Sequence, residues 1–221
     1  MGNLHDGHLS LIDIAKKKTS KVIVSIFVNP LQFGQNEDFM KYPRSFKMDV
    51  NKLEKSNCDI LFAPKNGKEV FNKFGNLKYL NAGPKGDILC GKLRPGHFDG
   101  VLKVVYMLFR LTQPDISIFG LKDFQQLYLV KKMAKKYFPK LKIISAPTIR
   151  AENGLALSSR NSYLDKTTIK IAPLFYKILS EGISNIKTSN NVDETIHSIT
   201  RKLEKNKFHV NYVSLLTTEL N

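Results

Sequence analysis

The chain has 221 residues, enough to bury a core in one large or two modest domains, and its 42% hydrophobic and 24% charged residues are typical of a globular protein. No apolar run approaches membrane-spanning length and the first residues lack the pattern of a secretory signal, so we expect a cytoplasmic protein without a membrane partner. A net charge of +16 would attract nucleic acid. The lysines, however, are spread along the chain on predicted solvated helix faces, at residues 16–18, 131–136 and 202–207, so we expect no nucleic-acid partner.

The chain opens with two histidines, His5 and His8, separated by Asp6 and Gly7. An apolar-periodic segment follows and predicts a helix to Lys18, which places both imidazoles at its N-terminus. Backbone N–H groups there suit a phosphate, the glycine lets a base or phosphate approach closely, and histidine can donate to phosphate oxygens. The same run also fits a polar loop or half of a metal site, but no second cluster with ligand spacing accompanies it, so we predict no metal ligands.

Residues 21–28 form a nearly continuous apolar run rich in β-branched side chains, typical of a parallel strand buried on both faces. Asn29 and Gln32 follow it, and ligands of open α/β sheets bind beyond the carboxyl ends of strands, so both are candidates for substrate binding. Both also fit an ordinary turn. The pattern then predicts a helix over 45–56, a strand over 58–63, and a surface loop over 65–86 with at most one short strand at 77–80.

Arg94 and His97 flank a Pro-Gly pair just before a predicted helix that runs to Phe109. An arginine and a histidine at a helix start fit an anion or carboxylate site. They fit a plain turn with two polar residues equally well, so the sequence leaves both interpretations open.

A predicted strand over 115–120 delivers Lys122 and Asp123 to the same sheet edge, and a helix follows to about Tyr137. The lysine can neutralise phosphate, whereas the carboxylate can accept from a ribose hydroxyl or cap the helix.

After a strand over 141–146, Ser158, Ser159 and Arg160 supply two hydroxyls and a guanidinium suited to phosphate oxygens, although they also fit a polar loop. The remaining pattern predicts helices over 166–182 and 192–205 and a terminal strand over 210–216. Strand and helix alternation predicts an α/β protein with a Rossmann-like, doubly wound parallel sheet over 1–146 and a smaller α+β domain over 147–221.

Six segments carry a family resemblance: Met-Gly-Asn-Leu-His-Asp-Gly-His at 1–8, Phe-Val-Asn-Pro-Leu-Gln-Phe at 27–33, Tyr-Pro-Arg at 42–44, Arg-Pro-Gly-His-Phe at 94–98, Phe-Gly-Leu-Lys-Asp-Phe-Gln-Gln at 119–126 and Leu-Ser-Ser-Arg-Asn at 157–161. Together they resemble the pantothenate synthetase (pantoate-β-alanine ligase) family of the nucleotidyltransferase superfamily, to which the class I aminoacyl-tRNA synthetases also belong. The His-x-Gly-His run alone marks the superfamily, whereas the ordered set is specific to the family.

The resemblance implies a two-step reaction. ATP and pantoate give pantoyl adenylate and pyrophosphate, and the amine of β-alanine then displaces AMP to give pantothenate. It also implies a homodimer and magnesium held largely through the triphosphate, with Asp49 as a candidate contact. Residues 1–146 would be the nucleotide- and pantoate-binding domain, and residues 147–221 an incomplete lid domain.

Carried over residue by residue, the resemblance makes His8 catalytic and gives His5 a supporting role at phosphate. Gln32 and Gln126 would hold pantoate, Gln32 also lying near β-alanine, with Asn29, Arg94 and His97 as further substrate-binding candidates. The ATP site would comprise Met1, Gly2, Asn3, Leu4, His5, Asp6, Gly7, His8, Gly120, Leu121, Lys122, Asp123, Ile149, Leu157, Ser158, Ser159 and Arg160, the last three acting like the mobile KMSKS loop of the synthetases.

Some features depart from the family pattern. Family members carry a strand and Pro-Thr before the motif methionine, which is residue 1 here, and their small domain continues with strands past the point where Asn221 stands. We therefore expect a chain truncated at both ends, through fragmentation, a misassigned start or genuine loss. Lys103 also stands where threonine is common. The alternatives are a catalytically weak nucleotide-binding remnant and a nucleotidyltransferase with another acceptor.

Overall fold

The computed structural model describes residues 1–71, 77, 79–189 and 191–221. Its internal contacts divide the chain into two compact units, residues 1–148 (unit 1) and 149–221 (unit 2), and each is described by itself. The predicted boundary near Pro147 lies beside this division. Within the described ranges, no helix is both long enough and apolar enough to cross a membrane.

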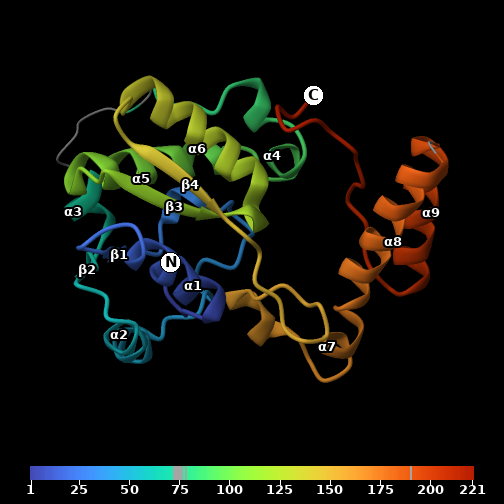
Figure 1. The fold of residues 1–221 in the computed structure, drawn as a ribbon, viewed down its shortest axis with the longest axis horizontal. Coiled ribbons are helices and arrows are strands. Elements are labelled where there is room, and N and C mark those ends of the chain that lie inside the picture. The colour runs from blue at the N-terminus through green and yellow to red at the C-terminus, as the bar shows by residue number, and fades with distance from the viewer. Residues whose placement is uncertain (72–76, 78, 190) are drawn as a thin grey trace. The chain divides into compact units, whose positions relative to one another are not determined.

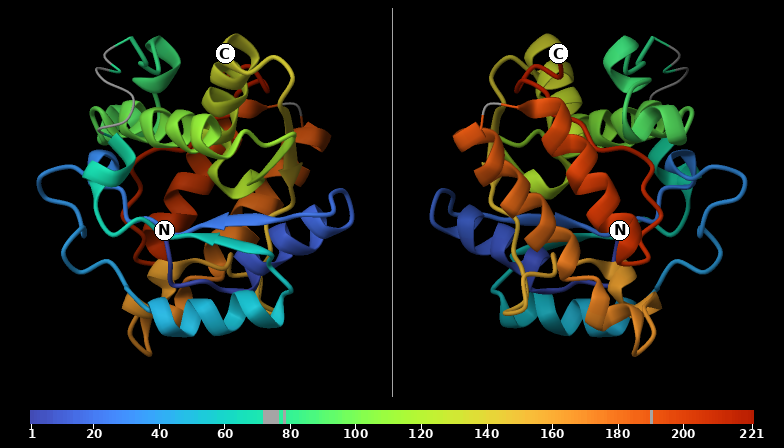
Figure 2. Two further views of the ribbon diagram at one scale, coloured as in Figure 1. Left: turned by 90° about the vertical axis from the view of Figure 1, so that its left-hand side faces the viewer. Right: turned by 90° about the vertical axis from the view of Figure 1, so that its right-hand side faces the viewer.

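Unit 1 is built on two pairs of parallel strands. Strand β1 (Ile23–Ser25) pairs with β2 (Ile60–Phe62), with Ile23 opposite Ile60, and β3 (Ile116–Gly120) pairs with β4 (Lys142–Ala146), with Ile116 opposite Lys142. Figure 2 shows β1 and β2 side by side above α2 (Phe46–Lys55) in its left-hand view. The predicted α/β class with parallel strands is confirmed, although the described strands form two separate two-stranded sheets.

Helix α5 (His97–Thr112) is the most buried helix of unit 1. Its apolar stripe includes Val101, Val104 and the fully buried Met107. Burial of each of these side chains stabilises the fold by roughly 1.5–3 kcal/mol. The helix packs against α6 (Phe124–Tyr137), which in turn contacts β3 and β4 (Figure 1). The other helices of unit 1 are α1 (Asp6–Lys16), α3 (Gly67–Phe71) and α4 (Cys90–Leu93), with single 3-10 turns η1 (Pro30–Gln32), η2 (Pro84–Gly86) and η3 (Leu121–Asp123).

Several predictions for unit 1 need adjustment. The strands predicted over 21–28 and 58–63 span only Ile23–Ser25 and Ile60–Phe62, and the first is not buried on both faces, since Ile23 and Ser25 are exposed. Helix α1 ends at Lys16 rather than Lys18, since residues 17 and 18 belong to the turn that closes it. The short strand expected at 77–80 falls partly outside the described residues, and Leu77, Tyr79 and Leu80 are not in a strand.

Gly100 lets α5 lie directly on η1. A Cβ atom at this position would come within 1.9 Å of the carbonyl oxygen of Leu31, a backbone atom that cannot move aside. Only glycine allows this approach, which places the start of α5 beside the turn that follows β1.

Unit 2 is mainly helical, with α7 (Thr168–Ile171), α8 (Leu174–Ser189), α9 (Val192–Lys205) and the 3-10 turn η4 (Ser159–Tyr163). Helices α8 and α9 pack closely because Gly182 has no Cβ; a Cβ at this position would lie 2.3 Å from the side chain of Ile199. Ile178 and Leu203 complete the buried contact.

The structure corrects two predictions in unit 2. The single helix over 166–182 is divided at Pro173, whose ring and missing N–H interrupt the helical hydrogen bonds, and the first piece starts only at Thr168, where Asp165 accepts from its backbone N–H at 2.7 Å. The terminal strand over 210–216 is wrong. That segment has no strand to pair with in the described part of unit 2, and an extended segment without a partner leaves its backbone groups to water.

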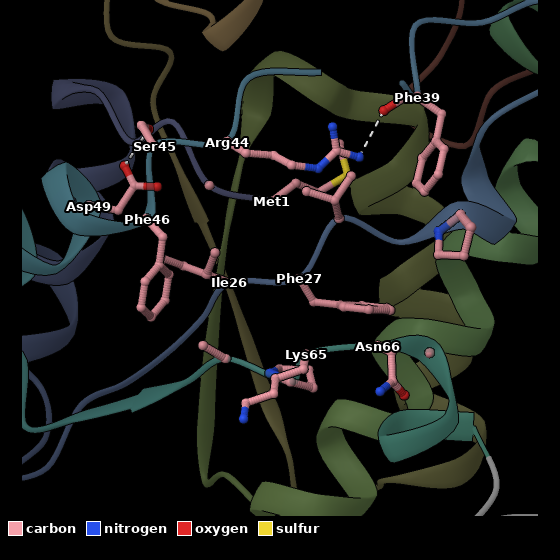
Figure 3. A pocket seen from close by; sticks show the side chains of 16 residues that line it. Met1, Ile26, Phe27, Phe39, Arg44, Ser45, Phe46, Asp49, Lys65 and Asn66 are labelled. Carbon is pink, nitrogen blue, oxygen red and sulfur yellow. Dashed lines mark hydrogen bonds between the residues drawn. The ribbon is translucent and has the colours of Figure 1, made fainter. Parts of the chain in front are cut away.

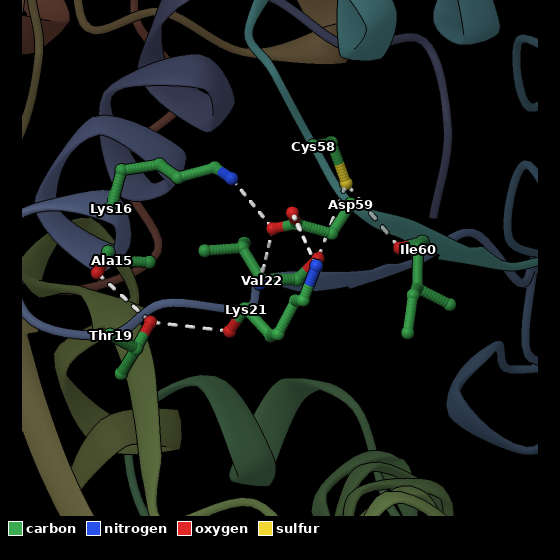
Figure 4. Close-up of polar contacts among 8 residues, drawn as sticks. All are labelled: Ala15, Lys16, Thr19, Lys21, Val22, Cys58, Asp59 and Ile60. Atoms are coloured by element: carbon green, nitrogen blue, oxygen red, sulfur yellow. Dashed lines mark hydrogen bonds and ion pairs between the residues drawn. The ribbon is translucent and has the colours of Figure 1, made fainter.

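Asp59 joins the end of α1 to the start of β2 (Figure 4). Its Oδ2 accepts from Lys16 Nζ at 2.6 Å and from the backbone N–H of Val22 at 2.7 Å, and Lys21 Nζ lies 3.7 Å from Oδ1. The hydrogen bond from Lys16, followed by that from Val22, lowers the pKa of this carboxyl below its usual value. The contact therefore favours the ionised side chain.

We predict that Asp59→Asn lowers the melting temperature at pH 7, because the amide loses the charge that Lys16 binds. A depressed carboxyl pKa stabilises the fold above the unfolded value of about 3.9 and loses its effect as the pH falls through the folded value. The difference from wild type should therefore shrink in acid. Calorimetry from pH 7 to pH 3 would measure it, with Asp13→Asn on exposed α1 surface as the control; equal melting temperatures at pH 7 would refute the contribution.

Candidate active site

The turn that leads into α1 has an uncommon backbone. Gly2 and Asn3 have positive φ angles of 92° and 50°, a region that glycine enters without strain. A Cβ at Gly2 would also lie 3.2 Å from Asp49 Oδ2 and 3.3 Å from Ile26. The turn is thus held in contact with α2 and with the residue that follows β1.

Asp49 of α2 fixes this turn through its carboxylate. It is only 1% exposed, and its two oxygens accept from the backbone N–H groups of Asn3 at 2.8 Å and Leu4 at 2.7 Å. Ser45 Oγ donates to Oδ1 at 3.2 Å, and Lys52 Nζ donates to the carbonyl of Leu4 at 2.5 Å. Asp49, the predicted candidate contact for magnesium, thus uses both of its oxygens as acceptors for groups of the protein.

His5 and His8 lie against each other at the first turn of α1. His5 is the N-cap residue, with an extended backbone, and the two ring centroids are 4.0 Å apart. The backbone N–H of His5 donates to Nδ1 of His8 at 3.3 Å. Since Nδ1 accepts, the neutral ring of His8 carries its proton on Nε2. Nδ1 of His5 is buried and has no hydrogen-bond partner among the described residues.

Burial keeps both rings neutral. Burial, followed by the charges of His5 and of nearby cations that include Lys122, lowers the pKa of His8 to about 3. Burial followed by the charge of Lys122 also lowers the pKa of His5. Lys122 thus acts on the histidine pair although it lies more than a hundred residues away in sequence, and the two motifs belong to one electrostatic site.

Hydrogen bonds through the side chain of Asn29 determine the orientation of the Gln32 amide. The buried amide of Asn29 accepts from the N–H of Leu31 at 3.2 Å and donates to the carbonyl of Gly100 at 3.1 Å, so its oxygen and nitrogen cannot be exchanged. The same nitrogen donates to Oε1 of Gln32 at 3.2 Å. Gln32 therefore points its NH2 group away from Asn29, toward Met1, where Nε2 lies 3.0 Å from the sulfur.

Arg94 and His97 bind protein groups close to Gln32. Arg94 donates from Nε to Glu37 Oε1 at 2.7 Å, pairs through Nη2 with Oε2 of the same carboxylate, and donates to the carbonyl of Gln32 at 3.2 Å. His97 Nδ1 lies 2.7 Å from that carbonyl. Sequence reasoning missed Glu37, because nothing local marks an acidic residue as the partner of an arginine 57 positions later.

Gln125 and Gln126 have different surroundings at the start of α6. Gln125 is buried and donates to the carbonyls of Lys85 and Ile88 at 2.9 and 2.8 Å, and its Oε1 is buried without a partner among the described residues. Gln126, the residue predicted to hold pantoate, is half-buried. Lys122 and Asp123 of η3 are exposed and form an ion pair at 3.7 Å.

The predicted ATP-binding residues of unit 2 lie on one hairpin and the turn after it. Leu157 donates from its backbone to Ile149 at 3.0 Å, next to an antiparallel bridge between Arg150 and Ala156. The guanidinium of Arg150 stacks on the Tyr176 ring of α8 at 3.5 Å. Ser158 then caps η4 by accepting from the N–H of Arg160 at 3.2 Å, and Ser159 is buried.

A cavity of about 650 Å³ opens where β1 and β2 end (Figure 3). Its wall is mostly apolar and shares Met1, Gly2 and Asp49 with the turn before α1. The remaining lining was not predicted from sequence, although the Pro that follows each strand marks the same sheet edge: Ile26, Phe27, Val28, Pro30, Phe39, Arg44, Ser45, Phe46, Ala63, Pro64, Lys65, Asn66 and Gly67.

Residues 1–220 match the family model described as pantoate-β-alanine ligase. A pantothenate synthetase of Ruthia magnifica is 45% identical over 98% of this chain and 76% of its own length, and one of Acinetobacter baumannii is 42% identical over 96% and 75%. Pantothenate synthetase from Thermus thermophilus superposes with a TM-score of 0.94 at 38% identity, over 100% of this chain and 80% of its own. The Francisella tularensis ligase, complexed with β,γ-ATP and β-alanine, gives 0.85 at 39%, over 98% and 79%. The resemblance read from the motifs is therefore confirmed.

We predict that His8 does not titrate between pH 5 and pH 8 in the folded protein, since its pKa is lowered to about 3. In the unfolded chain the His8 side chain binds a proton below about pH 6.5, whereas in the folded protein it stays neutral. The free energy of unfolding therefore decreases as the pH falls below that value. Nitrogen-15 NMR of the ring would show an unchanged signal with the proton on Nε2. The chain in urea serves as the control, and a folded-state midpoint near 6.5 would contradict the neutral ring.

Proposed function

The chain belongs to the pantoate-β-alanine ligase family, and from this premise we propose that unit 1 carries the chemical centre of an ATP-dependent condensation of pantoate with β-alanine. In the first step a carboxylate oxygen of pantoate attacks the α-phosphorus of ATP, and pyrophosphate leaves. In the second step the amine of β-alanine attacks the acyl carbon of the adenylate, loses a proton and displaces AMP.

The observation that carries this proposal is the neutral, desolvated His8 at the N-terminus of α1. The pantoate carboxylate is already ionised at neutral pH, so the first step needs no general base. It needs fixed donors for the charge that develops on the α-phosphate oxygens. We assign that role to Nε2–H of His8, together with the backbone N–H groups at the start of α1 and a supporting contact from His5.

Lys122 supplies the positive charge of the proposed ATP site. Its side chain is 40% exposed, and its charge lowers the pKa of both histidines, which supports a phosphate position close to all three side chains. We propose that Gly120 at the end of β3 and Leu121 and Asp123 of η3 belong to the same ATP site. For Ile149, Leu157, Ser158, Ser159 and Arg160 of unit 2, ATP binding stays a prediction from the family resemblance.

We propose that magnesium enters with the triphosphate. In the described part of the chain, no group of three or more His, Cys, Asp or Glu side chains is arranged to hold a metal, and Asp49 uses both oxygens on backbone donors. Magnesium readily keeps water and phosphate oxygens as ligands. In this proposal the protein side chains act on the phosphates directly.

For pantoate we propose Gln32 and Gln126. The NH2 group of Gln32, which points toward Met1, can donate to a hydroxyl or carboxylate oxygen, and this polarity suits pantoate better than the ammonium group of β-alanine. The family resemblance alone supports a cytoplasmic homodimer. Light scattering that gives twice the 25.1 kDa mass of the chain would test the dimer.

Pyrophosphate release tests the proposed reaction. With ATP, magnesium and pantoate, we expect release that depends on pantoate and turns over repeatedly only when β-alanine is added. ATP binding without pyrophosphate release would instead indicate the catalytically weak nucleotide-binding remnant.

We predict that His8→Ala lowers the rate of adenylation roughly 100- to 1,000-fold while leaving the fold intact, because one fixed donor to the transition state is lost. His8→Gln should keep part of the rate, since its amide nitrogen can replace Nε2–H as a donor. Pyrophosphate release and circular dichroism would measure rate and fold. An alanine variant that retains most of the wild-type rate would exclude the assigned role.

We predict that Gln126→Ala raises the KM for pantoate roughly tenfold or more and the KM for ATP much less, because its amide would hydrogen-bond pantoate alone. The neighbouring Gln125→Ala is the matched control. It removes the donor to two buried carbonyls and should lower the free energy of unfolding by about 1–3 kcal/mol without a selective effect on pantoate. Equal changes in both KM values for Gln126→Ala would count against the assignment.

A further inference from the structure

One cluster of polar groups is held together by hydrogen bonds among its own members: Glu37, Arg94, His97 and the carbonyl of Gln32. Arginine only donates, so Nε2 of His97, 3.2 Å from Nη1 of Arg94, must accept and carry no proton. The proton of the neutral ring then lies on Nδ1, which donates to the carbonyl of Gln32 at 2.7 Å. Burial lowers the pKa of His97, in agreement with this neutral ring.

The charge of Arg94 is neutralised inside the protein. The guanidinium uses Nε and Nη2 on the carboxylate of Glu37, and the hydrogen bond from Arg94 is the main cause that lowers the pKa of Glu37. Its remaining partners are His97 and the carbonyl of Gln32. A substrate carboxylate at this guanidinium would meet the negative charge of Glu37, so the cluster is poorly suited to bind an anion.

The cluster is well suited to fix Gln32. Arg94 and His97 both donate to the Gln32 carbonyl, while Gly100, one turn further along α5, admits the backbone of Leu31 and receives the amide of Asn29. The main chain of Gln32 is thus held from one side and its side chain from the other.

We propose that Glu37, Arg94 and His97 are positioning residues that set Gln32 for pantoate and do not themselves contact the substrate. This inference rests on the proposed function, in which Gln32 binds pantoate. Glu37 orients Arg94, Arg94 orients His97, and the two donors fix the main chain from which the side chain of Gln32 extends.

The test is a double-mutant cycle on the KM for pantoate. Glu37→Gln keeps the shape but removes the charge, and should raise the KM for pantoate roughly 3- to 10-fold, the loss of about one hydrogen bond at Gln32, with little change in kcat or in the KM for ATP. In a Gln32→Ala background the same substitution should have no further effect. Glu54→Gln, on the exposed side of α2, is the matched control.

The outcomes separate the two proposals. If Gln32→Ala leaves the KM for pantoate unchanged, the assignment of Gln32 in the proposed function fails. If Gln32→Ala raises it but Glu37→Gln has the same effect with and without Gln32, the cluster acts on the substrate directly and the positioning role is overturned.

Two further measurements test the positioning role, and the second does not require turnover. His97→Asn retains an N–H donor near the Nδ1 position and should preserve the KM for pantoate, whereas His97→Leu should raise it. The side-chain amide signal of Gln32 in nitrogen-15 NMR, identified by its loss in Gln32→Ala, should shift in Glu37→Gln and stay in place in Glu54→Gln. An unmoved signal in Glu37→Gln would overturn the positioning role even in an inactive protein.

Discussion

The buried carboxylate of Asp49 is the constraint on which the site depends. A carboxylate that is 1% exposed is costly unless hydrogen bonds satisfy it, and here the backbone N–H groups of Asn3 and Leu4 do so. These bonds hold a turn with two consecutive positive φ angles, which would not persist by itself. The turn determines where His5 caps α1 and where His8 lies. An interaction between α2 and the start of the chain thereby fixes the proposed catalytic group.

Neutral donors with fixed direction are the common feature of this site. His8 is oriented by the N–H of His5, His97 by Arg94, and Gln32 by Asn29, and each series ends at a backbone group whose polarity cannot change. Burial keeps the rings uncharged, so in the proposed reaction the donors need little reorganisation when charge develops on a phosphate. The proposed source of cationic charge is Lys122, whose side chain is exposed.

The first turns of α5 connect the fold to substrate recognition. This helix carries much of the apolar core of unit 1, and its packing on η1 depends on the missing side chain of Gly100. His97 lies at its first position and donates to Gln32. The burial that stabilises the helix thus also fixes the position of Gln32, the residue proposed to bind pantoate. Under the proposed function, packing in this part of the core therefore contributes to both stability and pantoate binding.

Periodicity, turn residues and ordered motifs are local properties, and they were enough to predict the α/β class, the parallel strands, the approximate bounds of α1, α2 and α6, and the family. They could not predict which side chains meet. Folding pairs Arg94 with Glu37, joins Asp49 to the turn at Asn3 and places Gln125 on the carbonyls of residues 85 and 88, and among the described residues of unit 2 it offers residues 210–216 no strand to pair with. These outcomes depend on partners tens of residues away. A local pattern specifies what a residue can do, whereas the packed fold decides which of its possible partners it reaches.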